Sequence, residues 1–517
     1  MQWNELVKLA LLGTERSTLS LAAKSALEQY GIDTSKEMTE VILEATALQA
    51  PLQKAGYEPA KWEGETINSS PKEVLDGCSR KSAKHLELIL KGTYSPALSE
   101  FVETMQLYQK GLPFESLPDL LDKCVKDELL WRQIRPIIGE RGKWLTQLNP
   151  RWQKLAPNIS NEQWEIGTKA ERIRLLTEMR RRNPSEGLQL LATTWSEEGL
   201  SEKTAFIKCL VIGLSPLDEP FLEATLDFPR KEVREIAATL LAQLPQSQLQ
   251  QRIFSAAKKA IQLGQTEEGR EKPIIQLPNT KDKDLIRDGI SPKKKWKKGG
   301  EITGMLYQMV AIIPPERWKQ YLQKSPSEIL TFFAQSEWAM MLVEGLARAA
   351  KLHDADAWKE AILRFWLRHY THRQWIQLDV SPILDSLSNE VFNAVLFEKL
   401  RAISFLPEEH SPLIQLLQKE QYIWEERLVN LVMNQLKTWI QENASYSWSG
   451  YQYRLLVKKA AYTVPPALEK KLSQFWLNDG YNWAGWEKDL QQFLTVLRFR
   501  REMLEELAGE EVEGQKG

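Results

Sequence analysis

Apolar residues recur along most of this chain at the spacing of one helix face. Between residues 233 and 244 they fall at alternating steps of three and one. Because an α-helix has about 3.6 residues per turn, these positions form one apolar stripe. The stripe and three others like it consist of Val233, Ile236, Ala237, Leu240, Leu241 and Leu244; Trp338, Met341, Leu342 and Leu346; Trp358, Ile362, Phe365 and Trp366; and Leu428, Leu431, Val432, Leu436 and Trp439. The sequence has no convincing runs of alternating β-branched residues, so the pattern predicts an all-α protein.

Short polar breaks such as Asn183-Pro184 and Ser215-Pro216 separate the predicted helices. Each helix carries a stripe that it cannot bury alone, so stacked antiparallel pairs are expected, as in an α-solenoid. The segment 227–241 resembles the second helix of a HEAT repeat. It has the turn residue Asp227, the Val233-Arg234 pair, and an Ala-Ala then Leu-Leu spacing.

The periodicity divides the chain into five segments. We expect an N-terminal helical domain at 1–165, HEAT-like repeats at 166–264 and a second helical-repeat block at 301–443. A C-terminal helical cap with an acidic tail follows at 444–517. Residues 265–300 lose the periodicity and gain charge, Pro and Gly, which predicts a long charged linker that interrupts the solenoid.

Composition restricts the class of protein. The 517 residues carry a net charge of −1, so the molecule as a whole is not built to grip nucleic acid. The three cysteines (Cys78, Cys124 and Cys209) are far apart, which suits a reducing compartment rather than a disulfide framework. The sequence shows neither a secretory signal at its start nor an apolar run long enough for a membrane span. We therefore expect a cytoplasmic protein without a membrane partner.

Motifs that would carry chemistry are missing from the sequence. It contains no phosphate-binding glycine loop and no nucleophile elbow. The pairs His369/His372 and Cys78/His85 each lack the further ligands that a zinc site needs. The corner Gly139-Glu-Arg-Gly142-Lys is too short for a phosphate cradle and is interpreted as a helix C-cap and turn. The sequence thus predicts no catalysis, no cofactor and no metal.

The strongest local charge is the basic run Lys293, Lys294, Lys295, Trp296, Lys297 and Lys298. Lysines around a tryptophan could hold a phosphate backbone and stack a base. The alternative is a solvated loop that keeps a linker extended or pairs with nearby acidic residues. The chain has 19 tryptophans, and they too have two interpretations: core residues between helices, or a stacking surface.

Three motifs resemble one known family. They are Leu11-Leu12-Gly13-Thr14-Glu15-Arg16; Gly139-Glu-Arg-Gly142-Lys-Trp144-Leu145 with Asn149-Pro150-Arg151-Trp152; and Asp284-Leu-Ile-Arg287-Asp288-Gly289-Ile290. The chain is similar to an uncharacterised bacterial all-helical family, classed only as a domain of unknown function, whose members look like HEAT-type solenoids. Genes for such proteins often lie beside those for a SWIM zinc-finger protein, a MoxR-type AAA+ ATPase and von Willebrand factor A proteins. The resemblance implies a role in binding a partner, and it assigns no catalytic residue.

The leading hypothesis is a non-catalytic scaffold or adaptor that binds a protein partner. By the resemblance, that partner is a MoxR-type AAA+ ATPase or a von Willebrand factor A protein. The alternatives are a nucleic-acid-binding helical-repeat protein, which would use residues 293–298, and a HEAT-like DNA glycosylase. Net charge and the lack of a broad basic stripe count against both alternatives.

Seven residues are candidates for structural or partner-binding roles: Arg141, Trp144, Asn149, Trp152, Arg287, Asp288 and Gly289. We expect Trp144 and Trp152 to be largely buried at a helix corner. Within an otherwise irregular 265–300 segment, we expect Asp288 to cap a turn or pair with an arginine. Gly289 is expected to supply a positive φ.

Overall fold

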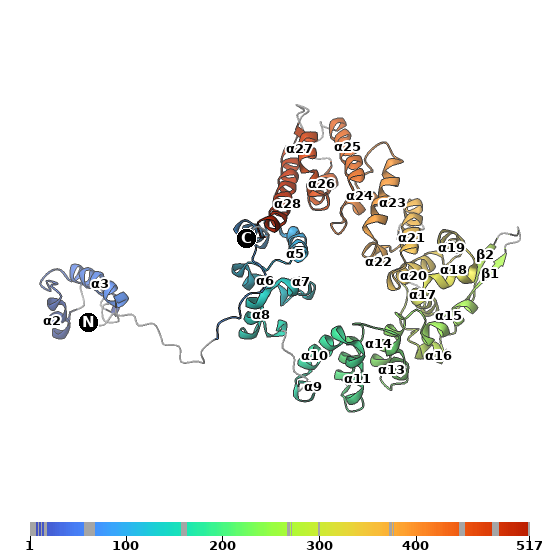
Figure 1. Cartoon of the computed structure of the whole chain (residues 1–517), viewed down its shortest axis with the longest axis horizontal. Coiled ribbons are helices and arrows are strands. Elements are labelled where there is room, and N and C mark those ends of the chain that lie inside the picture. Colours follow the sequence, from blue (N-terminus) through green and yellow to red (C-terminus); the bar gives the residue numbers. More distant parts are fainter. Residues whose placement is uncertain are drawn as a thin grey trace. The chain divides into compact units, whose positions relative to one another are not determined.

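The structure of the chain is a computed structural model. It describes every residue outside 1–6, 9, 12, 15–17, 56–67, 157–162, 266–268, 270, 298–299, 372–374, 376, 444–449, 478–484 and 515–517. The described residues form 27 α-helices, α2 to α28, and one two-stranded sheet (Figure 1). The predicted all-helical class is therefore confirmed, apart from this small sheet. The chain divides into two compact units, residues 1–70 and 71–517.

The first unit contains the helices α2 (Leu21–Gln29) and α3 (Met38–Ala55). Ser20 begins α2, because its hydroxyl accepts a hydrogen bond from the Ala23 backbone N–H at 3.2 Å. Leu27 and Val41 belong to the small apolar core of this first unit. Leu12, Glu15 and Arg16, from the first motif, lie outside the described residues.

The second unit opens with five helices: α4 (Arg80–Leu90), α5 (Leu98–Leu107), α6 (Leu117–Cys124), α7 (Glu128–Ile134) and α8 (Gly139–Leu148). Their apolar side chains share a core with Phe499, Met503 and Leu507 of the last helix, α28 (Glu487–Gly514). Residues at the two ends of this unit are thus buried against each other.

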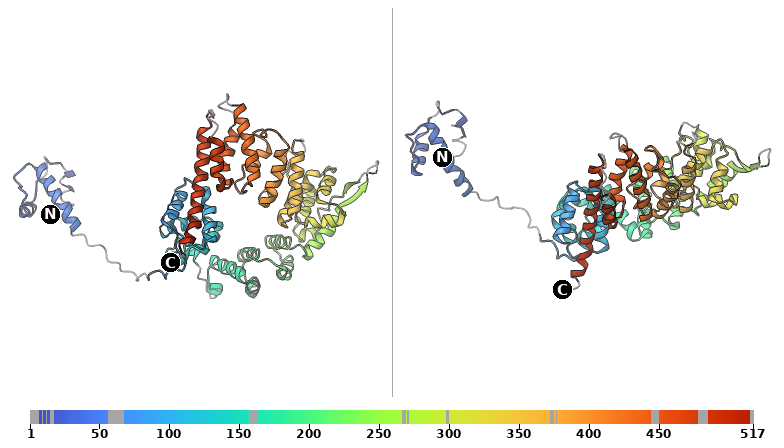
Figure 2. Two further views of the ribbon diagram at one scale, coloured as in Figure 1. Left: turned by 45° about the horizontal axis from the view of Figure 1, so that its top comes forward. Right: turned by 90° about the horizontal axis from the view of Figure 1, so that it is seen from above.

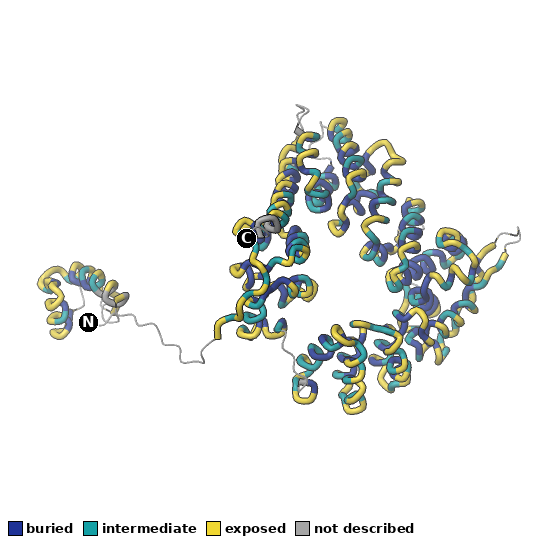
Figure 3. Tube along the Cα trace, viewed as in Figure 1, coloured by how far each residue is buried: buried dark blue, intermediate teal, exposed yellow. Residues whose placement is uncertain are grey.

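Most of the second unit is a succession of helices with one continuous core. The helices and strands are α9 (Gln163–Ile166), α10 (Lys169–Arg182), α11 (Pro184–Thr194), α12 (Leu200–Cys209), α13 (Glu219–Thr225), α14 (Lys231–Leu241), α15 (Gln248–Ala260), β1 (Ile261–Gln265), β2 (Glu271–Ile275), α16 (Lys283–Arg287), α17 (Glu301–Ile312), α18 (Pro315–Leu322), α19 (Pro326–Phe333), α20 (Ala339–Leu352), α21 (Asp356–His369), α22 (Ser381–Leu384), α23 (Asn389–Arg401), α24 (Pro412–Leu417), α25 (Glu426–Glu442), α26 (Tyr451–Thr463) and α27 (Glu469–Leu477). The core runs from Trp164 to Leu497 without a break, and buried positions recur in every helix from α10 to α26 (Figure 3).

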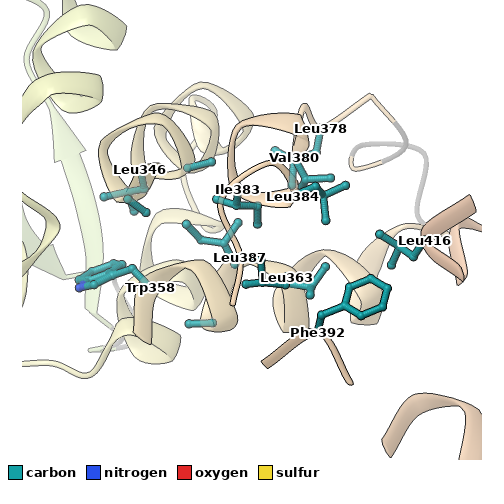
Figure 4. Packing of buried hydrophobic residues seen from close by; sticks show 14 of the residues in the cluster. Leu346, Trp358, Leu363, Leu378, Val380, Ile383, Leu384, Leu387, Phe392 and Leu416 are labelled. Carbon is teal, nitrogen blue, oxygen red and sulfur yellow. The ribbon is translucent and has the colours of Figure 1, made fainter. Parts of the chain in front are cut away.

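The four predicted stripes lie on helices α14, α20, α21 and α25, and their apolar side chains are buried or half-buried. Figure 4 shows the core around α21, where Trp358, Leu363, Ile383 and Phe392 from three helices pack together. Trp358 is fully buried, and its indole N–H donates to Glu316 at 2.9 Å. The tryptophans of this region therefore serve as core side chains.

Buried polar side chains join successive helix pairs. We call five of them the junction side chains: Arg180, Lys359, Asn393, Gln435 and Arg500, each at most 6% exposed. Each donates to a main-chain carbonyl at or beside a helix end in a neighbouring pair. The carbonyls belong to Leu210, Ser386, Ile423, Leu400 and Ala461, and they lie 27 to 39 residues away along the chain. The carbonyls of Leu210, Leu400 and Ala461 lie at a C-cap or in the last turn of a helix, where the i+4 donor is missing, whereas those of Ser386 and Ile423 lie in the adjoining loops.

Arg500 also pairs the last helix with the first ones. Its guanidinium donates to the Glu100 carboxylate at 2.7 and 2.8 Å, although the two residues are 400 positions apart. Beside this pair Phe499 stacks on Tyr94, with ring centroids 3.8 Å apart. The helix α28 contacts both α4 and α5, and Figure 1 shows its C-terminal part beside α5, as does Figure 2, where the red helix lies against the blue ones. The chain segments at the two ends of the second unit therefore form one joint.

The described residues of 265–300 contradict the prediction of an irregular linker, and they include a β-strand that the sequence pattern did not predict. They hold the end of an antiparallel hairpin, β1 with β2, followed by the helix α16. Leu285 and Ile290 are buried in the same core as the helices on either side, so the predicted irregular linker is wrong for these residues. The hairpin escaped prediction because Gly264 and Pro273 obscure its pattern. A Cβ at Gly264 would lie 2.3 Å from the end of the Ile274 side chain, so a larger residue there would have to displace that side chain.

The two cores of the second unit change over near residues 156–163 and again within α28. The first of these positions lies close to the expected boundary at 165, whereas the second matches none of the expected boundaries, and the five-segment division itself stays a prediction. Among the described helices, none is both long and apolar enough to cross a membrane.

Removing the Glu100 carboxylate tests the joint between the ends of the second unit. The substitution Glu100→Ala leaves the Arg500 charge buried without its acidic partner, which should lower the free energy of unfolding by about 3 kcal/mol. Urea denaturation followed by circular dichroism measures this. Glu103→Ala, at an exposed position on the same helix, is the matched control and should change stability by less than about 0.5 kcal/mol. Equal effects would contradict the role given to this pair.

A second prediction concerns acid sensitivity. Hydrogen bonds from Arg135 hold the pKa of the buried Glu178 at about 2, below its ordinary 4.5. Because the folded-state pKa is depressed, the ion pair stabilises the protein fully above pH 4.5 and loses this contribution as the pH falls towards 2. Glu178→Gln should therefore destabilise the protein at neutral pH, with a deficit that shrinks below pH 4.5. Melting temperatures against pH test this, and Glu197→Gln at an exposed site should keep the wild-type profile.

Candidate functional site around Asp288

The first group of candidate residues lies on α8 and its ends. Gly139 directly follows Ile138, the C-cap of the 3₁₀ helix Arg135–Ile137, so this glycine agrees with the predicted helix C-cap, whereas residues 140–143 belong to the first turns of α8. Gly139 has a φ of +69°, and the Glu73 carboxylate accepts hydrogen bonds from the backbone N–H groups of Glu140 and Arg141 at 2.9 and 3.3 Å. A carboxylate on the free N–H groups of a helix start stabilises that helix.

The C-terminal end of α8 carries two more of the candidate residues, Asn149 and Trp152. Asn149 ends the helix, and its side chain accepts from the Arg151 backbone N–H at 3.0 Å. Trp152 is buried, as predicted, and its indole N–H donates to Asp122 at 2.8 Å. Trp144 is half-buried, so its side chain is less enclosed than that of Trp152. Arg141 is exposed and lies over the Phe114 ring. These residues build a helix and its turn.

The second group forms a defined helix end. Asp282 begins α16 by accepting hydrogen bonds from the backbone N–H groups of Asp284 and Leu285. After Arg287 the chain turns at Gly289, which has the predicted positive φ of +88°. The N–H groups of Gly289 and Ile290 then return to the carbonyls of Ile286 and Leu285. This is a Schellman motif, in which Ile290 packs near Leu285.

Asp288 pairs with an arginine, as predicted, and lies at the centre of an ion-pair network that the sequence did not predict. It is 3% exposed and accepts from Arg252 on α15 at 2.7 and 2.9 Å, and from Arg287 at 3.1 Å. Arg252 also donates to Glu223, and Arg287 to Asp227. The bonds to Asp288 raise the pKa of Arg252, and the bond to Asp227 raises the pKa of Arg287. Three carboxylates and two arginines thus fix the 282–291 segment against α13 and α15.

Three residues of the lysine run, Lys294, Trp296 and Lys297, are held in place by carboxylates. The Trp296 indole N–H donates to Glu344 at 2.7 Å, and the Lys297 ammonium pairs with the same buried carboxylate. Lys294 pairs with Glu235 at 3.2 Å. Gly304 allows this close packing, because a Cβ there would lie 2.2 Å from the Lys294 carbonyl oxygen. Lys293 and Lys295 are exposed, and Lys298 lies outside the described residues.

The motif and the lysine run together form one wall of a pocket of about 590 Å³. Its apolar lining includes Ala238, Ala242, Ile290, Ala311, Ile312 and Leu352. Its charged and hydroxyl side chains are Glu235, Thr239, Asp288, Lys294, Tyr307, Arg348 and Lys351. The Arg348 guanidinium donates to the Tyr307 hydroxyl at 3.4 Å, and burial raises the pKa of that phenol. The volume falls within the ~300–1,000 Å³ of small-molecule pockets.

Buried cysteine thiols and candidate metal ligands are the other side chains that could carry chemistry. Burial raises the pKa of the Cys124 thiol to about 12 and also raises that of Cys209, so both stay protonated near neutral pH. Within the described ranges no three His, Cys, Asp or Glu side chains are placed to hold a metal ion. His372 lies outside those ranges.

Sequence reasoning missed Arg252, Glu344 and Arg348. Arg252 and Glu344 act through partners 36 and 48 residues away, so no local spacing marks them. Arg348 lies on the exposed edge of α20, where a lone arginine is an ordinary solvated residue. Only the packing of α14, α17 and α20 against the motif brings these side chains together.

Residues 5–507 match the model of a Family of unknown function (DUF5691). The chain belongs to this family. No curated protein and no solved structure matches it. Membership agrees with the resemblance carried by the three motifs and assigns no activity.

The Asp288 network makes a testable prediction. Asp288→Asn weakens the charged hydrogen bonds from two arginines, which should lower the local opening free energy of residues 283–297 by about 2 kcal/mol. Hydrogen exchange measures this. Asp284→Asn, at an exposed position of the same short helix, is the matched control and should leave exchange in 288–297 unchanged. Unchanged exchange in Asp288→Asn would contradict the network's role.

Proposed function

We propose that this protein is a cytoplasmic helical-repeat scaffold that binds a protein partner and has no catalysis of its own. The proposal rests on one observation: a single core runs from Trp164 to Leu497 through helices packed on their neighbours along the chain. In such an array each unit contacts only the units next to it, and the exposed helix faces form extended binding surfaces.

The junction side chains support the repeat part of this proposal. Their bonds span 27 to 39 residues, close to the period of about 34 to 47 residues in two-helix repeats. Arg234 donates to the carbonyls of Phe228 and Pro229, so it fixes the turn that the HEAT-like segment was expected to contain. An α-solenoid of HEAT-like pairs accounts for both features.

The contacts at the candidate site also favour binding over catalysis. Asp288, Arg252 and Glu344 are tied to oppositely charged partners that hold helices together. A general acid or base needs reach to a substrate proton, and these groups are already committed to structural bonds.

Nucleic-acid binding is the second candidate, and Lys293 and Lys295 are the observation in its favour. Both are exposed, and among the described residues neither has an ion-pair partner. Against this candidate, Trp296 is half-buried, its N–H is bonded to Glu344 and the Lys297 ammonium lies over its ring, which leaves less of the ring open to a base. Lys294 and Lys297 are likewise paired within the fold.

Binding at several salt concentrations separates the two candidates. The full chain would be tested by biolayer interferometry against a MoxR-type AAA+ ATPase, a von Willebrand factor A protein, and single- and double-stranded DNA and RNA. We expect protein binding that persists from ~50 to ~200 mM salt, whereas binding to phosphates falls by orders of magnitude over that range.

A double variant sharpens the comparison. Lys293→Gln with Lys295→Gln should leave protein binding intact, and Lys458→Gln with Lys470→Gln removes the same charge at other exposed positions. The scaffold proposal is overturned by tight, salt-sensitive nucleic-acid binding that the first pair abolishes and the second retains, with neither protein bound.

A further inference from the structure

The pocket beside Asp288 has an apolar floor and a positively charged rim. Ile290, Ala311 and Ala242 are buried and line its depth. The rim carries the exposed cations Lys294, Arg348 and Lys351. The lining as a whole carries three cations, two carboxylates and a largely apolar floor, an arrangement that suits an amphipathic anion.

The carboxylates in the lining do not cancel this charge. Asp288 already accepts from Arg252 and Arg287, and Glu235 has Lys294 and Lys231 within 3.2 and 3.7 Å. Lys351 has an exposed partner, Asp385, at 3.3 Å. Such an exposed pair contributes little and leaves its lysine able to turn to a ligand.

Among the three rim cations, Arg348 makes the weakest interactions with other residues of the protein. Within the described part of the chain, its one hydrogen bond is to the Tyr307 hydroxyl, and no carboxylate lies within ion-pair distance. A guanidinium presents a planar fork of donors that fits an oxyanion in two places at once. The Tyr307 phenol, held protonated by burial, adds a hydroxyl donor beside it.

We propose that this pocket binds a small amphipathic oxyanion, with its apolar body between α14 and α17 and its carboxylate or phosphate on Arg348. The motif residue Gly289 contributes to the shape of the cavity, since a Cβ there would lie 2.7 Å from the Ala238 Cβ. The motif at 284–290 therefore does more than hold its segment against the neighbouring helices, because it also shapes one wall of the cavity. This inference is independent of the scaffold function, and either stands if the other fails.

Benzoate, phenyl phosphate and the neutral benzyl alcohol are suitable probes, because they share one ring and differ in charge. Saturation-transfer NMR on the full chain should show saturable binding of at least one anion, about tenfold tighter than benzyl alcohol. The tighter of the two anions identifies the oxyanion as carboxylate or phosphate. No saturable binding of either anion, or equal binding of benzyl alcohol, overturns the proposal.

Two variants locate the binding. Arg348→Gln should weaken the anions about tenfold and leave benzyl alcohol unchanged. Thr239→Phe fills the pocket from an exposed position on α14 and should abolish binding of all three probes. Both side chains are exposed, so the fold should be retained, and circular dichroism checks this.

Matched controls exist for both variants. Arg401→Gln removes an exposed arginine elsewhere, and Thr495→Phe changes an exposed helical threonine that bonds the carbonyl four residues back, as Thr239 does. Both should bind the probes like the wild type. Anion affinity unaffected by Arg348→Gln, or lowered equally by Arg401→Gln, overturns the assignment.

Discussion

The arrangement of this protein depends on how neighbouring helix pairs satisfy each other's helix ends. Every helix leaves its last carbonyls without an intrahelical partner, and leaving one buried and unpaired costs about 1–3 kcal/mol. Arg180, buried at 1% exposure, donates to the carbonyls of Leu210, Ile212 and Gly213 and to Asp218. Apolar stripes alone would tolerate sliding between helices, whereas such a set of bonds fixes one position.

A buried arginine that bonds to main-chain carbonyls also joins the two ends of the second unit. Arg500 bonds the carbonyls of Ala461 and Val464 in the pair before it, and its remaining donors hold Glu100. One guanidinium therefore belongs both to the succession of helices and to the joint with α5. A contact that links the first helices of this unit with its last helix buries apolar side chains from both ends of the unit at once.

The Asp-Leu-Ile-Arg-Asp-Gly-Ile motif shows how one short sequence serves folding and a surface together. The buried Asp288 carboxylate accepts hydrogen bonds from the partly exposed Arg252 and Arg287, while Gly289 turns the chain so that Ile290 faces the core. The following residues then reach Glu344, whose carboxylate holds Trp296 and Lys297. The pocket forms where this ordered strap crosses α14, α17 and α20, so its shape depends on the same bonds that stabilise the segment.

The sequence alone determined the features that are local. The spacing of Val233, Ala237 and Leu241 marks a helix face whatever surrounds it, and Asp288-Gly289 carries its own turn chemistry. Tertiary structure decided whatever depends on partners distant in sequence. The Gly139 corner begins a helix because Glu73 lies over it, and the strands at 261–265 and 271–275 form because they pair with each other. The lysine run looked like a free loop because nothing near it in sequence shows that Glu235 and Glu344 lie against it. Helix periodicity is a property of one segment, whereas the charge balance of a pocket is set by segments that only folding brings together.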